Sequence, residues 1–336
     1  MVTGGTGFLG SHLICHLLDA GQRIRAIRRT HASFDILRRV FSFYNRDFDA
    51  SAGLIEWIEA DITDVYSLED CLDGVTDVYH AAALVSFQPG DQDRLDLVNV
   101  AGTANLVNAC LDKKIRKLCH VSSIAAIGRA DNDQVIDEEV IWKASRRNSH
   151  YAVSKYGAER EVWRGIEEGL DAVIVNPSII LGPGELNSGS TRLIKTVEKG
   201  LKFYTPGCNG FVDVRDVVSV MIRLMESEIT AERFIVSAEN LTYRELFGII
   251  AQALGKPAPG LKAGRFMGEV YWRTERIKAL ITGKKPLVTR ETAQTANNSY
   301  IYSSEKIRER LNYQYISIEK SVMDACRFLG MNVNQQ

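Results

Sequence analysis

Apolar and β-branched residues come in short runs through the first half of the chain, separated by longer stretches with apolar residues every three or four positions. The runs predict strands at 1–3, 23–28, 54–60, 77–81, 117–122 and 172–176. The longer stretches predict helices at about 8–20, 65–72, 95–111 and 150–168. Because alternating strands and helices form right-handed crossovers, we expect an α/β fold with a doubly wound, mainly parallel sheet.

The pattern changes after Pro177, where glycine and proline punctuate a loop-rich stretch. A strand at 233–237 and helices near 242–254, 266–281, 304–311 and 318–328 follow. We expect residues 1–176 to bind a dinucleotide, with 211–238 returning to that domain. Residues 177–210 and 239–330 are expected to form a smaller, mostly helical lobe for the substrate. The first strand is short, which suggests that a few residues precede Met1.

Composition and charge narrow the class of protein. The chain has 336 residues, of which 45% are hydrophobic and 25% charged, and its net charge is −1. These values are typical of a soluble globular protein and argue against a nucleic-acid-binding protein. The six cysteines form no C-x-x-C pair, and no His, Asp and Glu spacing predicts a metal site. The first 18 residues are uncharged but lack a basic start, so we expect a cytoplasmic protein without a transmembrane segment.

A glycine-rich segment follows the first predicted strand and opens the first helix. Gly4, Gly7 and Gly10 lie in T-G-G-T-G-F-L-G, with Phe8 and Leu9 at the start of the helix. Glycine permits the tight turn and lets a pyrophosphate approach the backbone, and a helix N-terminus attracts phosphate. This context predicts a Rossmann-type domain that binds a dinucleotide.

Basic residues end the second predicted strand. NAD-binding domains have an acidic residue there for the ribose 2′-hydroxyl, whereas this chain has Arg28 and Arg29. Arginine binds phosphate with two parallel hydrogen bonds, so we favour NADP(H), with NAD(H) possible. Asp61 and Ile62, after the third strand, are placed near the adenine. Further cofactor contacts are expected from small residues after the fourth strand, Ala81, Ala82 and Ala83.

Tyr151 and Lys155 lie four residues apart at the start of a predicted helix, which puts them on one face. A tyrosine has an ordinary pKa near 10, and a nearby ammonium lowers the pKa of the phenol toward working pH. Lys155 can also hydrogen-bond the nicotinamide ribose. Ser123, at the end of the fifth strand, is placed to polarise a substrate oxygen. Together these residues predict a hydride-transfer site.

These residues resemble the extended short-chain dehydrogenase/reductases, also described as the NAD-dependent epimerase/dehydratase family. The resemblance covers nearly the whole chain and includes T-G-G-T-G-F-L-G at 3–10, D-I at 61–62, H-A-A at 80–82, N-V-x-G-T-x-N-L-V-x-A at 99–109, V-S-S at 121–123, Y-x-x-x-K at 151–155, N-P-S-x-x-x-G-P-G at 176–184 and F-V-D-V-R-D-V at 211–217. The resemblance implies a triad of Ser123, Tyr151 and Lys155. It also places Asn99 and Pro177 at the cofactor, and we add Val121, which opens the V-S-S motif.

Within the family, the sequence is most similar to the branch of dihydroflavonol-reductase-like and 3β-hydroxysteroid-dehydrogenase-like enzymes. Sugar dehydratases carry an Asp-Glu pair after the strand-end hydroxyl residue, where this chain has Ile124 and Ala125. We therefore expect an NAD(P)-dependent oxidoreductase that acts on a carbonyl or alcohol. A nucleotide-sugar epimerase with the same triad is the alternative, and a non-catalytic NADP-binding regulator is a third. The substrate itself cannot be read from the sequence.

Several features have simpler interpretations. His80 is expected to be a packed core histidine, and Asp213 and Asp216 to cap a helix that begins near Val217. The basic segment 262–290 is either a lid over the substrate or a solvated helix. The helices at 95–111 and 151–168 carry more apolar residues than one sheet face requires, and by resemblance they would pair across a two-fold axis in a homodimer. The residues behind this expectation are Leu97, Val98, Ala101, Leu106, Cys110, Ala152, Ala158, Val162 and Trp163.

Overall fold

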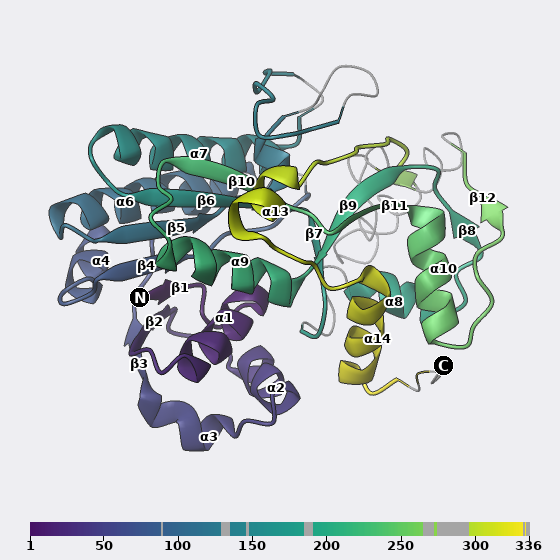
Figure 1. Cartoon of the computed structure of the whole chain (residues 1–336), viewed down its shortest axis with the longest axis horizontal. Coiled ribbons are helices and arrows are strands. Elements are labelled where there is room, and N and C mark those ends of the chain that lie inside the picture. Colours follow the sequence, from purple (N-terminus) through teal and green to yellow (C-terminus); the bar gives the residue numbers. More distant parts are fainter. Residues whose placement is uncertain are drawn as a thin grey trace.

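A seven-stranded parallel sheet forms the larger lobe of the molecule (Figure 1). The computed structural model describes the chain apart from residues 89, 129–134, 146–147, 185–190, 265–271, 274–295, 332 and 334–336. The strand order is β10-β6-β5-β4-β1-β2-β3, with all neighbours parallel. The strands are β1 (Val2–Thr3), β2 (Ile24–Arg28), β3 (Ile55–Glu59), β4 (Asp77–His80), β5 (Lys117–Val121), β6 (Ala172–Pro177) and β10 (Glu232–Val236).

Helices cover both faces of this sheet and bury a separate apolar core on each (Figure 1). One face carries α1 (Phe8–Asp19), α2 (Asp35–Phe43) and α9 (Val214–Glu226). The other face carries α4 (Val65–Cys71), α6 (Gly102–Asp112) and α7 (His150–Glu167). The expected doubly wound α/β fold is confirmed.

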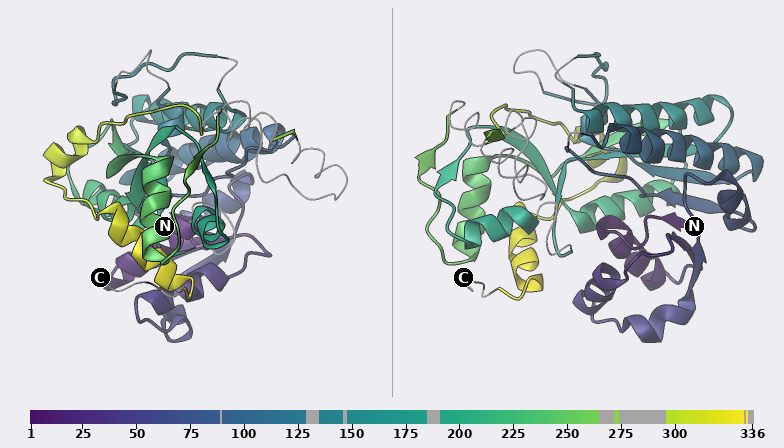
Figure 2. Two further views of the ribbon diagram at one scale, coloured as in Figure 1. Left: turned by 90° about the vertical axis from the view of Figure 1, so that its right-hand side faces the viewer. Right: turned by 180° about the vertical axis from the view of Figure 1, so that it is seen from behind.

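The smaller lobe lies beyond the carboxyl ends of the strands, on the right in Figure 1 and on the left in the rear view of Figure 2. Its helices include α8 (Thr191–Glu198), α10 (Tyr243–Ala253) and α14 (Ile318–Phe328), which pack around a third apolar core. The expected helical lobe is therefore present. It also contains a three-stranded sheet that we did not predict, of β7 (Ile179–Leu181), β9 (Cys208–Asp213) and β11 (Glu239–Thr242), and a pair formed by β8 (Phe203–Tyr204) and β12 (Leu261–Lys262).

Two helical regions depart from the sequence analysis. The polar segment after β2 contains α2 and the short α3 (Phe48–Ser51), because Leu37, Val40 and Phe41 form a buried helical stripe. The helix expected at 95–111 begins with α5 (Gln92–Leu95), continues as a π-helix over Asp96–Ala101, and becomes regular in α6. The helix expected at 266–281 and most of the basic segment 262–290 lie outside the described residues.

The chain returns to the large sheet through β10, which pairs with β6 along its whole length. Within the expected returning segment 211–238, Phe211–Asp213 instead belongs to the small sheet. Asp213 caps α9 by accepting a hydrogen bond from the Arg215 amide, as expected for a cap. Asp216 does not cap the helix. Its buried carboxylate accepts hydrogen bonds from the Tyr313 hydroxyl and the Ile316 amide. Both donors lie shortly after α13 (Glu305–Leu311) in the chain.

Candidate active site

The glycine-rich turn lies directly against the end of β4. Gly4 has a φ of +71°, and a Cβ there would lie 2.8 Å from the backbone of Ala81 and Ala82. A Cβ on Gly10 would lie 2.2 Å from the carbonyl oxygen of Gly4, so the helix could not approach the turn. The backbone of Gly7 donates to Gly4 across the turn at 3.0 Å. The three glycines therefore form the close-packed turn that the sequence predicts.

The N-terminus of α1 faces the space above this turn. The N-cap is Gly7, and no side chain caps the helix. The first-turn amides, to which Phe8 and Leu9 belong, therefore provide hydrogen-bond donors and a positive dipole end for phosphate. Ser11 does not block them, because its hydroxyl donates to the Gly7 carbonyl at 2.7 Å. The turn and the uncapped helix fit the pyrophosphate of a dinucleotide.

The end of β2 is basic in the structure as well. Arg28 lies 5.6 Å from the centre of the Phe34 ring, and Arg29 is exposed. Neither guanidinium has a hydrogen bond or an ion pair with another described residue. Among the residues that the structure describes, no carboxylate therefore pairs with either guanidinium.

Asp61 and Ile62, which we expected near the adenine, follow β3. Asp61 accepts hydrogen bonds from the Thr63 amide at 2.9 Å and the Thr63 hydroxyl at 2.8 Å. The Ile62 side chain is buried, and a Cβ on Gly102 would lie 2.8 Å from it. Ile62 can therefore offer a ligand its backbone but not its side chain. Ala81, Ala82 and Ala83 follow β4 beside the glycine turn and are partly or fully exposed.

Ser123, Tyr151 and Lys155 come together where β5 ends and α7 begins. Lys155 is 2% exposed, and its ammonium donates to the Val121 carbonyl at 2.8 Å. Ser149 caps α7 and so fixes the turn that carries Tyr151. Ser123 lies just beyond β5 and accepts a hydrogen bond from the Ala125 amide at 3.2 Å. Pro177, expected at the cofactor, is buried at the end of the neighbouring strand β6.

Burial dominates the titration of the tyrosine and the lysine. It raises the pKa of the Tyr151 phenol, and a hydrogen bond with Ser123 opposes the rise. It lowers the pKa of Lys155 to about 8, against the attraction of the Glu159 carboxylate. We expected Lys155 to lower the pKa of Tyr151. Within the chain itself the pKa of Tyr151 moves the other way, because burial penalises the charged phenolate.

Asn99 lies in the π-helix and is 1% exposed. Its side-chain oxygen accepts from the Leu84 amide at 2.7 Å, and its nitrogen donates to the Leu84 carbonyl at 3.0 Å. The same nitrogen donates to the Ser154 hydroxyl at 2.9 Å, which in turn donates to the Tyr151 carbonyl at 2.9 Å. Asn99 therefore fixes the loop after β4 to the turn of α7 that carries Tyr151. π-helical turns are frequent at functional sites.

His80 is a packed core histidine, as expected. Its Nδ1 lies 2.8 Å from the Thr3 hydroxyl and its Nε2 lies 3.0 Å from the Thr103 hydroxyl. Thr103 donates to the carbonyl of Asn99 at 2.6 Å. The chain of hydrogen bonds thus runs from the glycine turn to the π-helix, and burial lowers the pKa of His80 to about 3.

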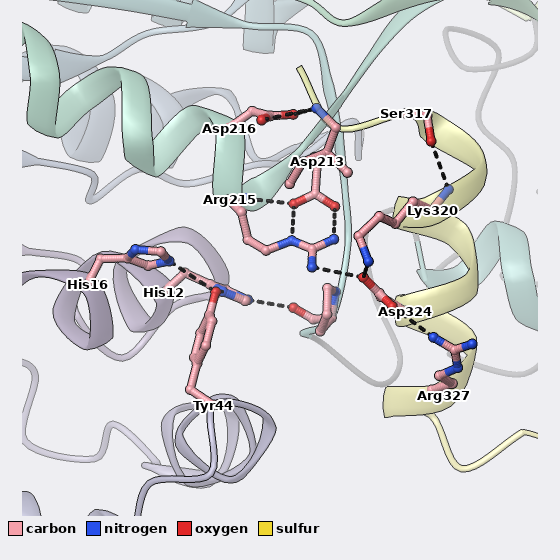
Figure 3. A network of polar contacts seen from close by, with 12 residues as sticks. His12, His16, Tyr44, Asp213, Arg215, Asp216, Ser317, Lys320, Asp324 and Arg327 are labelled. Carbon is pink, nitrogen blue, oxygen red and sulfur yellow. Dashed lines mark hydrogen bonds and ion pairs between the residues drawn. The ribbon is translucent and has the colours of Figure 1, made fainter. Parts of the chain in front are cut away.

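A second buried histidine, His12, joins α1 to the smaller lobe (Figure 3). Its Nε2 donates to the carbonyl of Pro183 at 2.6 Å, since a carbonyl only accepts, and its Nδ1 accepts from the Tyr44 hydroxyl at 2.7 Å. Nearby, Arg215 binds Asp213 with two hydrogen bonds and Asp324 of α14 with another, each 2.8 Å long. The loop that leads into the smaller lobe is therefore tied to the glycine-turn helix.

An apolar loop borders the reactive phenol. The Phe87 ring meets the Tyr151 ring edge to face, with centroids 5.3 Å apart. Val85 is 63% exposed and Phe87 is 38% exposed. On the other side of the site, Ile124 and Ala125 form part of a short helical turn after β5. The loop that contacts the Tyr151 ring therefore carries two exposed apolar side chains.

Sequence analysis missed one buried ionic group in this region. Glu159 lies one turn beyond Lys155 on α7 and pairs with Arg233 of β10 at 3.1 Å. Its spacing from Lys155 is the only sign in the sequence, and that spacing is common on exposed helix faces. Elsewhere among the described residues, no three His, Cys, Asp or Glu side chains are arranged to hold a metal ion. No helix of the described chain is long and apolar enough to span a membrane.

The apolar surface expected between two copies is smaller than the sequence suggests. Leu106, Cys110 and Val162 pack into the core between α6, α7 and the sheet, so they are not available to a partner. On these helices Leu97 is 53% exposed and Val153 is 47% exposed. The sequence cannot separate the two cases, because a helix that covers a sheet and a helix in an interface both carry a broad apolar face.

Comparisons with known proteins agree with the fold and the motifs. Residues 1–236 match the NAD dependent epimerase/dehydratase family. Sterol demethylase protein B of Methylococcus capsulatus is 34% identical over 266 residues, 78% of this chain and 76% of that protein. Tetraketide alpha-pyrone reductase 2 of Arabidopsis thaliana is 30% identical over 264 residues, 74% of this chain and 81% of that protein. The crystal structure of gox2253 superposes with a TM-score of 0.79 at 29% identity, covering 98% of this chain and 97% of that chain.

Proposed function

Because the chain belongs to the NAD-dependent epimerase/dehydratase family of extended short-chain dehydrogenase/reductases, we propose that it is an NADP(H)-dependent reductase of apolar carbonyl compounds. The match confirms the resemblance carried by the motifs and makes the protein an NAD(P)-dependent enzyme. In our proposal, Ser123, Tyr151 and Lys155 carry out the chemistry. The same residues would oxidise the corresponding alcohol in the reverse direction.

Each of the three residues has one main task in this proposal. When bound, the dinucleotide supplies the hydride that adds to the carbonyl carbon. Tyr151 donates its phenolic proton to the carbonyl oxygen and recovers a proton from solvent. The Ser123 hydroxyl hydrogen-bonds the same oxygen as negative charge develops on it. The Lys155 ammonium stabilises the phenolate that Tyr151 leaves behind and hydrogen-bonds the nicotinamide ribose.

The choice of substrate class rests on the exposed apolar residues of the loop that contacts Tyr151. Phe87 lies against the Tyr151 ring, and Val85 is exposed beside it. Exposed apolar side chains beside a reactive group favour an aromatic or aliphatic substrate over a sugar. The reductase activity in the name of the Arabidopsis relative is in keeping with this choice. Dehydration lacks an acid residue, because Ile124 and Ala125 stand where the sugar dehydratases have Asp and Glu.

Cofactor choice and assembly form the remaining parts of the proposal. Arg28 and Arg29, which have no acidic partner among the described residues, favour NADP(H) over NAD(H). We also propose a homodimer in which Leu97 and Val153 on the exposed face of the two helices meet their copies. A monomer mass by light scattering at micromolar concentration would remove the dimer from the proposal.

A nucleotide-sugar epimerase with the same triad is the second candidate, because the family includes epimerases by name. An epimerase oxidises and re-reduces one carbon, so it retains its dinucleotide and consumes none. A reductase exchanges its dinucleotide and consumes one NADPH for each alcohol formed. A non-catalytic regulator would bind NADPH without turnover, but it would have no use for the Tyr151 hydroxyl.

The deciding experiment measures dinucleotide content and stoichiometry on the purified protein. We expect little bound dinucleotide after gel filtration and NADPH consumption equal to alcohol formed with aromatic aldehydes such as 4-nitrobenzaldehyde. UDP-glucose with NAD⁺ serves as the epimerase arm. Tightly retained NAD(H) with interconversion of the sugar would replace the reductase by the epimerase, and NADPH binding with no turnover would leave the regulator.

A further inference from the structure

The carboxylate of Glu159 is buried one helical turn beyond Lys155 of the proposed triad. Glu159 lies on α7, four residues after Lys155, and is 2% exposed. Burying a carboxylate costs free energy unless donors replace the lost water. Such a group therefore needs a complete set of partners, and its partners indicate what it holds in place.

Four donors surround this carboxylate. One oxygen accepts from the Ser122 hydroxyl at 2.6 Å and from the Asn176 side chain at 2.8 Å. The other accepts from the Arg233 guanidinium at 3.1 Å and from the Trp163 indole at 3.4 Å. Arg233 is itself fixed, because its guanidinium also donates to the carbonyl of Val140 at 3.1 Å. Both oxygens thus have two partners, as an ionised carboxylate requires.

Three of the four donors come from three neighbouring strands, and Trp163 lies on α7 itself. Ser122 follows β5, Asn176 is in β6 and Arg233 is in β10. Glu159 therefore connects α7 to β6, to β10 and to the residue that follows β5, next to Ser123.

Asn176 carries this restraint to the serine. Its side-chain nitrogen donates one hydrogen to Glu159 and the other to the carbonyl of Ser123 at 3.0 Å. Both partners only accept, so the orientation of the amide is fixed. Glu159 and the backbone of Ser123 are thus linked through the two hydrogen bonds of one planar amide group, so the position of the carboxylate affects the position of the serine.

The charge of Glu159 also acts on Lys155, one turn earlier. Burial lowers the pKa of Lys155 to about 8, and Glu159 is the group that opposes this decrease. The other titratable groups that face Lys155 in the described chain are Tyr151 on α7, His80 on β4 and His120 on β5. Burial lowers the pKa of both histidines far enough to keep them neutral at pH 7. Arg233 faces Glu159 from β10.

We propose that Glu159 is a positioning residue of the active site, which fixes Ser123 through Asn176 and holds a carboxylate one helical turn from Lys155. The proposal rests on the proposed function, because it assigns Glu159 a task for the Ser123–Tyr151–Lys155 triad. The four partners of the carboxylate are all side chains of this protein. It acts only through the residues that do.

The test compares Glu159→Gln with the native protein and with Glu161→Gln. Glu161 is the matched control, because it lies on the same helix and pairs with Arg164 at 2.9 Å outside the site. Glutamine keeps the size of the side chain but removes the charge and turns one acceptor into a donor. We expect kcat for 4-nitrobenzaldehyde with NADPH to decrease about 10- to 100-fold in Glu159→Gln, because misplaced groups lose catalytic geometry. Glu161→Gln should keep native kcat.

A second readout needs no substrate. The NMR signal of the Lys155 side chain, labelled with ¹³C at Cε and identified by its loss in Lys155→Met, reports the titration of the ammonium. Its midpoint should move to lower pH in Glu159→Gln and stay in place in Glu161→Gln. The basic limb of the kcat profile should move in the same direction, because the ammonium is lost earlier as pH rises. A folded Glu159→Gln protein with native kcat and a native Lys155 midpoint would overturn the proposal.

Glu159→Asp separates the positioning effect from the charge. Its carboxylate is one methylene shorter, so it should lower kcat while leaving the Lys155 midpoint near the native value. If Glu159→Gln does not fold, native kcat in Glu159→Asp overturns the positioning role and a decreased kcat supports it. If the native protein reduces no carbonyl compound, the proposed function fails, and the Lys155 midpoint alone decides whether Glu159 acts on the lysine.

Discussion

The Lys155 ammonium lies 2.8 Å from the carbonyl oxygen of Val121, so the helix that carries Tyr151 is hydrogen-bonded to the last residue of β5, two positions before Ser123. Burial of its charged side chain costs free energy, because Lys155 is only 2% exposed. One of its three hydrogens is used by Val121, and the others remain for a ligand or for Tyr151. In the proposed function, these hydrogens would serve dinucleotide binding and proton transfer.

Removing the phenolic oxygen with Tyr151→Phe should decrease turnover by about 10²- to 10⁴-fold, as expected for loss of a general acid. Dinucleotide affinity, measured by NADPH fluorescence, should change little, because the ring and its contact with Phe87 remain. The comparison requires that chemistry is the slow step, which a deuteride isotope effect establishes. Native turnover under those conditions would show that another group supplies the proton.

Lys155→Met and Ser123→Ala should give different patterns. Loss of Lys155 should weaken NADPH binding and turnover together, because the ammonium is proposed to bind the ribose and to stabilise the Tyr151 phenolate. Loss of the Ser123 hydroxyl should decrease turnover by about 10²- to 10³-fold and leave binding intact, as for an oxyanion donor. Fluorescence titration and steady-state kinetics on both variants check this. Equal effects on binding would contradict the division of tasks.

Replacing Arg28 with Asp and Arg29 with Ser should weaken NADPH binding far more than NADH binding. The reason is that the two guanidinium groups have no acidic partner among the described residues, so their charge is available to a 2′-phosphate. Dissociation constants for both dinucleotides should be measured at one fixed salt concentration, since such contacts are screened. Tighter binding of NADH than of NADPH by the native protein would remove the preference.

The buried histidines should make the protein sensitive to acid. Burial lowers the pKa of His12 to about 4, below the value of about 6.5 in an unfolded chain. The unfolded state therefore binds more protons, and the free energy of unfolding should decrease as pH falls from about 6.5 toward 4. The slope is about 1.4 kcal/mol per pH unit for each such histidine. His12→Gln should have a shallower slope in urea denaturation, and an unchanged slope would contradict the assignment.

Gly10→Ala should destabilise the protein by about 1–3 kcal/mol, the usual range for overpacking, and abolish dinucleotide binding. The added methyl group would meet the Gly4 carbonyl at 2.2 Å. Gly248→Ala in α10 is the control, because a Cβ there has no atom within 4 Å. Thermal denaturation should show Gly248→Ala unchanged or more stable by up to about 1 kcal/mol. Equal melting temperatures for the two variants would contradict the close approach.

The large sheet could be predicted because each strand carries its own signal. Ala172–Pro177 is buried throughout, and its first four residues are an uninterrupted apolar run in the sequence. The helix α2 also carries a signal, since Leu37, Val40 and Phe41 follow helical spacing, but Arg38 and Arg39 interrupt it and no helix was predicted there. The small sheet is different, because its strands pair across long stretches of chain.

The triad could be predicted from spacing and strand position, whereas its supporting residues could not. Glu159 is only meaningful beside Asn176 and Arg233, which lie 17 and 74 residues away in the sequence. The predicted direction of the Tyr151 pKa shift was wrong for a related reason. Spacing reveals that Lys155 is near, but the degree of burial depends on the whole fold, and burial is the larger effect here.

The late return of β10 to the large sheet has a consequence for synthesis of the chain. β6 pairs with β10, which begins 55 residues after β6 ends. During synthesis, one edge of β6 therefore has no partner strand until the ribosome has made these intervening residues. An open edge strand is a template for pairing with other chains. The two lobes are therefore not independent folding units that could be exchanged by cutting at Pro177, and truncation there would leave an aggregation-prone fragment.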